Sequence, residues 1–171
     1  MRDDNRPRPV TRAYLERAAL HYLERYASSS ENLRRILANK ARRRLGPEVP
    51  VTEDIADLIS AVVEKLVEGG FIDDRSFAEA KVSSLTRRGT STRFIRQKLR
   101  AKGVSEEHAE AALAEEELDE LALARRYAQR KRLGPWRTRP AADAREKDLA
   151  SLCRAGFPYA VARAALEGEA D

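Results

Sequence analysis

The chain has 171 residues and a formal net charge of +5, and 36% of its residues are charged whereas only 6% are aromatic. This composition favours amphipathic helices with thin cores over a broad sheet sandwich. The single cysteine, Cys153, excludes an intrachain disulfide framework and a cysteine-based metal site. No run of 18 uncharged apolar residues occurs, so we expect a cytoplasmic protein without a membrane contact.

The first third of the chain carries three stretches in which apolar residues recur every three or four positions, as on one face of a helix. The first stretch begins at Leu15. A run of serines at 28–30 offers hydroxyl caps for the second helix, and Thr52 offers one for the third. A pair of glycines that begins at Gly69 ends the third helix. The pattern therefore predicts a three-helix unit over residues 12–68.

Two adjacent carboxylates follow this unit in the stretch GGFIDDRSFAEAKV. Asp73 stands where the next helix needs an N-cap, and Asp74 stands where a negative charge favours the helix dipole. A catalytic pair would require a companion acid, nucleophile or metal ligand, and the neighbours Arg75, Ser76 and Phe77 supply none. We interpret the pair as the beginning of a helix. An enzyme built on the two carboxylates ranks third, after the two binding hypotheses given below.

The same order of helices recurs in the rest of the chain. Gly89 and Gly103 each end a further predicted helix. The stretch LRAKGVSEEHAEAAL at 99–113 matches LCRAGFPYAVARAAL at 152–166 in its Leu, Gly and final Ala-Ala-Leu positions, 53 residues later. Such self-similarity predicts small units that bury surface against their neighbours. We therefore predict an all-α protein, an elongated tandem array of three three-helix repeats over residues 12–68, 71–115 and 118–168.

Three stretches of the chain resemble the RecX family of bacterial regulatory proteins. They are ALHYLERYASSSENLRRIL at 19–37, GGFIDDRSFA at 69–78 and RRGTSTRFIRQKLRAKGVSEE at 87–107. With the repeats included, the resemblance covers residues 12–166. The residues that form its structural signature are Gly70, Phe71, Asp73, Asp74, Phe77, Gly89 and Gly103.

The resemblance implies a non-enzymatic regulator of the RecA recombinase. A member of this family is expected to dock along the groove of a RecA filament on DNA and to inhibit filament growth, ATP hydrolysis and strand exchange. It would thereby act as a negative regulator of DNA repair, recombination and the SOS response. We expect a monomer that uses no cofactor. We also expect no metal site, since His21 and His108 have no companion at ligand spacing.

Basic residues gather on several predicted helices. Arg93, Arg96 and Arg100 fall at i, i+3 and i+7, on one side of a helix, and Arg34 aligns with Arg96 in the repeat. The densest run is ARRYAQRKRLGPWRTR at 124–139. Guanidinium groups pair with carboxylates and with phosphates, so an acidic RecA surface and the DNA backbone both remain open as ligands. The predicted filament contacts are Arg34, Arg35, Arg42, Arg93, Arg96, Arg100, Arg125, Arg126, Arg130, Lys131 and Arg132.

Two other interpretations of these charges stay open. A helical protein that binds DNA by itself would use the same arginines on phosphates, and even a filament-binding protein would then touch DNA weakly. A solvated helix surface explains any single basic residue equally well. Salt dependence of DNA binding in the absence of RecA separates the first interpretation from filament binding.

Overall fold

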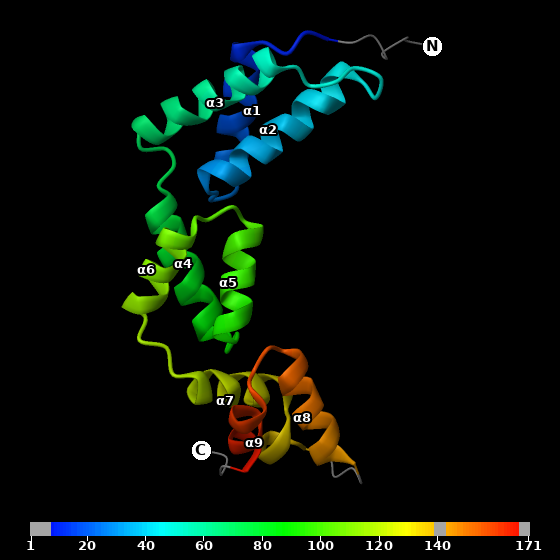
Figure 1. Cartoon of the computed structure of the whole chain (residues 1–171), viewed down its shortest axis with the longest axis vertical. Helices are drawn as coiled ribbons and strands as arrows, with labels where there is room; N and C mark the ends of the chain where they lie inside the picture. The colour runs from blue at the N-terminus through cyan, green and yellow to red at the C-terminus, as the bar shows by residue number, and fades with distance from the viewer. Residues whose placement is uncertain (1–7, 139–142, 168–171) are drawn as a thin grey trace. The chain divides into compact units, whose positions relative to one another are not determined.

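The computed structural model describes residues 8–138 and 143–167. Throughout these ranges every regular element is a helix, which confirms the predicted all-α class (Figure 1). The elements are α1 (Arg12–Leu23), α2 (Ser30–Leu45), α3 (Glu53–Glu68), α4 (Asp74–Arg87), α5 (Thr92–Ala101), α6 (Glu106–Glu115), α7 (Glu120–Lys131), the 3₁₀ helix η1 (Gly134–Trp136), α8 (Ala144–Arg154) and α9 (Tyr159–Glu167). No helix in the described part of the chain is both long enough and apolar enough to cross a lipid bilayer.

The helices form three successive groups of three, α1–α3, α4–α6 and α7–α9. The chain also divides into two compact units. Unit 1 contains the described residues up to Phe77 together with Lys102–Val104, and unit 2 contains Ala78–Ala101 and the described residues from Ser105 onward. The division falls inside α4 and assigns the turn after α5 to unit 1. The boundaries of the compact units therefore differ from the boundaries between helix groups.

The core of unit 1 lies between α1, α2 and α3. Leu15 of α1, Leu33 and Leu37 of α2, and Val62 and Val63 of α3 are fully buried in one cluster. These side chains occupy the apolar face that the three- and four-residue spacing predicts. Burial of each such side chain contributes about 1.5–3 kcal/mol, and this packing holds three helices that would be marginal alone.

The helices α7, α8 and α9 lie beside one another (Figure 1), and their buried side chains form a core of their own. Leu123 of α7, Leu152 of α8 and Phe157 between α8 and α9 are buried there. The ring of Tyr127 meets Phe157 edge to face, with 5.8 Å between centroids. Cys153 is half-buried against the same cluster, as a small apolar side chain.

Several helices, among them α3, α4 and α8, end in the same turn. Phe71, Thr90 and Phe157 each donate their backbone N–H to a carbonyl five residues earlier, which is the Schellman arrangement. The residue before each of them is a glycine with positive φ, as this turn requires. Gly89 and Gly103 therefore end α4 and α5 as the sequence predicts.

Candidate functional site

Asp73 and Asp74 both act as helix caps. The Asp73 carboxylate accepts the Ser76 backbone N–H at 3.0 Å and the Ser76 hydroxyl at 2.8 Å, which places it as the N-cap of α4. The Asp74 carboxylate accepts the backbone N–H of Ser30 at 2.7 Å and its hydroxyl at 2.6 Å. Asp74 thus lies at the beginning of α4 and binds the first residue of α2. The capping interpretation is confirmed, and the second partner is a feature that the sequence analysis missed.

The same device occurs in unit 2. The Glu120 carboxylate accepts the backbone N–H of Thr92 at 3.3 Å and its hydroxyl at 2.5 Å. Glu120 is the first residue of α7 and Thr92 is the first residue of α5, as Asp74 and Ser30 are in α4 and α2. In each unit, an acid that opens a helix group therefore binds the middle helix of the preceding group.

A serine beside each carboxylate completes the contact. Ser29 is the N-cap of α2, and its hydroxyl donates to the carbonyl of Lys102. Ser91 precedes α5, and its hydroxyl donates to the carbonyl of Ala155 at 2.7 Å. Both serines are fully buried. Their partners lie just before Gly103 and Gly156. The beginning of α2 therefore docks on the turn after α5, and the beginning of α5 docks on the turn after α8.

Glycines let these turns approach the helices. A methyl group on Gly103 would stand 2.8 Å from Glu31 Cβ, and one on Gly156 would stand 2.6 Å from Ser91 Oγ. Gly89 approaches α7 still more closely, because a methyl group there would lie 2.5 Å from the Tyr127 backbone nitrogen. Gly89 and Gly103 of the signature, and Gly156 with them, therefore serve packing between helix groups as well as backbone conformation.

Phe71 differs from its counterparts in the other turns. Phe157 holds the same place after α8 and is only 3% exposed, whereas Phe71 is 63% exposed. The Phe71 ring lies against Gly69. Phe77, also in the signature, is half-buried on α4.

The predicted basic residues of unit 1 lie on α2, which carries six basic residues and one acid. Arg35 pairs with Glu31 at 3.0 Å, and Arg34 lies 3.9 Å from the same carboxylate. Arg42 donates to the side-chain oxygen of Asn39 at 2.7 Å and is exposed. The adjoining α3 carries five acids and one base. Charge is therefore segregated between the second and third helices of this group.

In unit 2, α5 carries four basic residues and no acid, whereas α6 carries four acids and neither lysine nor arginine. Arg93 and Arg100 are exposed, and neither forms an ion pair with any residue that the structure describes. Arg96 instead binds Glu110 of α6 through two nitrogens, at 2.6 and 2.8 Å. The predicted stripe of three arginines therefore presents two uncommitted guanidiniums and one that already holds a carboxylate.

The Arg96–Glu110 pair has an electrostatic signature. The hydrogen bond from Arg96 lowers the pKa of the Glu110 carboxyl below its ordinary value, and the same bond raises the pKa of Arg96. Both side chains are about half exposed, at 51% and 48%. Exposed pairs of this kind contribute little to stability, so an external anion can compete for the guanidinium.

The remaining predicted contacts lie along and just after α7. Arg125, Arg126, Arg130 and Lys131 are all exposed, and the Arg130 guanidinium lies over the Tyr127 ring at 5.5 Å from its centroid. Arg132 follows the helix in the left-handed conformation, with φ of 55°, where most turns of this protein have glycine. Five of the predicted cations therefore lie on α7 or at its C-cap.

The basic run continues into a segment that the structure explains differently. Arg137 binds the carboxylate of Asp148 through Nε and Nη2, and Asp148 also accepts the Gly134 backbone N–H at 2.8 Å. Asp148 is only 2% exposed, so this pair fixes the η1 segment on α8. Arg137 is a structural residue despite its place in the run, and Arg139 lies outside the described residues.

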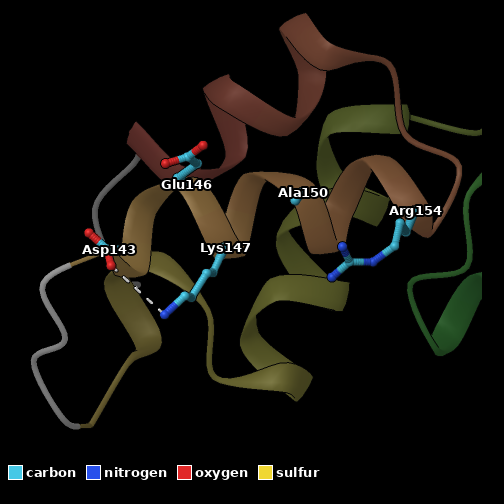
Figure 2. Close-up of a pocket in the computed structure, with 5 residues that line it drawn as sticks. All are labelled: Asp143, Glu146, Lys147, Ala150 and Arg154. Carbon is cyan, nitrogen blue, oxygen red and sulfur yellow. Dashed lines mark ion pairs between the residues drawn. The ribbon is translucent and has the colours of Figure 1, made fainter.

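A surface depression of about 380 Å³ follows one side of α8 (Figure 2). Its lining combines two acids, two bases and Ala150, and its Lys147 lies 4.0 Å from Asp143 (Figure 2). Such a mixed lining favours no ligand charge. Among the described residues, no group of three or more His, Cys, Asp or Glu side chains is placed to hold a metal ion.

These features define a helical-repeat protein whose acids stabilise helix ends and whose arginines face solvent on the middle helices. A family model described as the second three-helix domain of RecX matches residues 73–113. A regulatory protein RecX of Myxococcus xanthus is 41% identical over 170 residues, which is 97% of this chain and 91% of the relative. One of Agrobacterium fabrum is 30% identical over 87% of this chain and 79% of its own length. The chain belongs to the RecX family of regulatory proteins.

Solved structures share the fold. The crystal structure of RecX from Lactobacillus salivarius superposes with a TM-score of 0.63 at 21% sequence identity, and the match covers 91% of this chain and 94% of that one. A second crystal structure of a regulatory protein RecX gives a TM-score of 0.62 at 22% identity, over 88% of this chain and 68% of that one. The tandem three-helix architecture is therefore that of RecX structures.

Proposed function

We propose that this protein binds the filament that the RecA recombinase forms on DNA, in the cytoplasm, and inhibits filament growth, ATP hydrolysis and strand exchange. Family membership over 97% of the chain supports a regulatory role. The observation that carries the proposal is the recurrence of exposed arginines on the middle helices α2 and α5 of successive helix groups. A filament repeats the same surface from subunit to subunit, so a protein that repeats the same basic helix can contact several subunits at once.

The three helix groups, over residues 12–68, 71–115 and 118–168, are the proposed docking units. Arg93 and Arg100 contribute the uncommitted cations of the second helix group, and Arg125 and Arg126 contribute those of the third helix group. By occupying the groove, the protein shifts the filament toward the state that it binds more tightly. It acts by binding, since the two carboxylates that suggested catalysis accept hydrogen bonds from Ser30 and Ser76.

The test is RecA ATP hydrolysis on single-stranded DNA, titrated with this protein. We expect a dose-dependent fall at concentrations too low for binding to bare DNA at the same salt. The double variant Arg93→Gln/Arg100→Gln should raise the half-inhibitory concentration about tenfold, which corresponds to about 1.4 kcal/mol of binding energy. Unchanged hydrolysis and strand exchange at saturating wild-type protein would defeat the proposal.

A matched control removes two charges elsewhere in unit 2. Arg145 and Arg163 both pair with Glu167, at 2.6 and 3.7 Å, and their side chains are exposed. Arg145→Gln/Arg163→Gln changes the net charge by the same amount and should shift the half-inhibitory concentration less than about twofold. An equal shift in both double variants would reduce the contact on α5 to a general effect of net charge.

A stand-alone DNA-binding protein is the second candidate function. The observation that favours it is the concentration of exposed cations on α7 beside the Tyr127 ring. If inhibition of RecA occurs only where the protein coats free DNA, competition for the DNA becomes the better explanation.

A further inference from the structure

The approach of Gly89 to α7 brings two arginines from different helix groups together. A methyl group on Gly89 would lie 2.8 Å from Arg126 Cβ. Arg88 is the next residue along the chain, and consecutive Cα atoms are about 3.8 Å apart. The Arg88 Cα therefore lies within about 8 Å of Arg126 Cβ, a distance that two arginine side chains span easily. Both arginines are exposed, and both belong to unit 2.

No acid of the described chain neutralises this pair of cations. Neither Arg88 nor Arg126 forms an ion pair or hydrogen bond with its side chain to any described residue. The acid of α7, Glu120, is bound to Thr92, and the acid of the adjoining α9, Glu167, is bound to arginines at 2.6 and 3.7 Å. Two exposed arginines whose backbones the fold brings this close can both direct their charges at one anion.

We propose that Arg88 and Arg126 form a binding site for a phosphodiester of a nucleic-acid strand. A carboxylate offers its two oxygens in one plane, as Glu110 does to the two nitrogens of Arg96. Two guanidiniums that can reach one anion from different directions, one from the turn after α4 and one from α7, suit an anion with acceptor oxygens on several sides, and a phosphate has this geometry. Arg130 lies four residues beyond Arg126, about 6 Å along the helix axis, and extends the cationic surface toward a neighbouring phosphate.

This site goes beyond the proposed inhibition of RecA, because it gives the second candidate function, contact with nucleic acid in the absence of RecA, two named residues and a ligand group. Arg88 also lies outside every basic stripe that the sequence suggests, since the docking of Gly89 on α7 is what places it beside Arg126. The segment before α2 has no equivalent of this site. When Ser29 is aligned with its counterpart Ser91, Ala27 takes the place of Gly89 and Tyr26 takes the place of Arg88.

The test measures binding of the full chain to a fluorescein-labelled oligothymidylate by anisotropy, over a series of salt concentrations and without RecA. Arg88→Gln and Arg126→Gln should each weaken binding, and the double variant should reduce the slope of log affinity against log salt by about 0.7, the value for one phosphate of a single strand. The double variant should lose less than the product of the two single losses, because both arginines hold one phosphate. An oligoadenylate should give the same pattern, since a phosphate site does not read bases.

Arg154→Gln is the matched control. Arg154 is an exposed arginine of unit 2 on α8, at the far end of the depression in Figure 2, and it pairs with no described acid. Losses in Arg88→Gln and Arg126→Gln no larger than the loss in Arg154→Gln would overturn the site. Wild-type protein that inhibits RecA but does not bind the oligonucleotide would also overturn it and leave the proposed function intact. Wild-type protein that binds the oligonucleotide through these arginines but leaves RecA unaffected would overturn the function and support the site.

Discussion

Replacement of Gly89 by alanine tests the contact that joins α4 to α7. Gly89 has φ of 64°, a conformation that costs an alanine about 1–2 kcal/mol. The new methyl group would also stand 2.5 Å from the Tyr127 nitrogen and 2.7 Å from the Leu123 carbonyl oxygen, both of which are backbone atoms. Relief of such overpacking costs a further ~1–3 kcal/mol. We therefore expect Gly89→Ala to lower the free energy of unfolding by about 2–5 kcal/mol.

Gly70 supplies the control for this experiment. It has φ of 73° and occupies the same place in the turn after α3, but nothing lies within 4 Å of the position a methyl group would take. Gly70→Ala should therefore lower the free energy of unfolding by only about 1–2 kcal/mol, which is the conformational cost alone.

The assay is urea unfolding followed by circular dichroism, with amide hydrogen exchange at Tyr127 as a local readout. Gly89→Ala should lower the unfolding midpoint more than Gly70→Ala and should speed exchange at Tyr127, whereas Gly70→Ala should leave that amide protected. Equal losses of stability in the two variants would refute the close approach of Gly89 to α7. The proposed Arg88 and Arg126 site would then lose its geometric basis.

Three further variants test contacts that the structure adds to the sequence pattern. Arg132→Gly should raise the free energy of unfolding by about 1 kcal/mol in urea titrations, because it removes a side chain from the left-handed conformation. Arg96→Gln should raise the pKa of Glu110 toward its ordinary value in a carboxyl NMR titration, because the hydrogen bond that lowers this pKa is lost. In the wild type the Arg96–Glu110 pair is fully formed above the ordinary carboxyl pKa, and it is lost as the pH falls through the lowered pKa of Glu110. Asp148→Asn should cost about 3 kcal/mol of stability in the same urea titrations, since it leaves Arg137 without its buried carboxylate, and an effect below 1 kcal/mol would contradict the buried pairing.

Sequence reasoning predicted the helices well because each helix carries local signals. The spacing around Leu15 and Leu33 gives the buried faces of α1 and α2, and Asp73 marks the beginning of α4. Glycines end α4 and α5 where the turn needs a positive φ. These signals act over a few residues, so one sequence suffices to recognise them.

The partners of the charged residues could not be predicted in the same way. Asp74 binds Ser30 across 44 residues, and Glu110 binds Arg96 across 14. Periodicity places each of these side chains on a face of its own helix and does not say which other helix that face meets. Arg137 shows the consequence, since its place in a basic run suggests a solvent-facing charge whereas the fold turns it onto buried Asp148.

The segregation of charge explains how a modest net charge can still direct binding. The net charge of the chain is only +5, yet α2 has six basic residues to one acid while its neighbour α3 has five acids to one base. The same contrast separates α5 from α6. A uniformly basic surface of equal net charge would attract a polyanion in any orientation, whereas a segregated one presents the middle helices and turns the third helices away. Neutralisation of acids on α6 should therefore strengthen binding to nucleic acid and relax its orientation, whereas substitution of arginines on α5 should weaken binding and also relax its orientation.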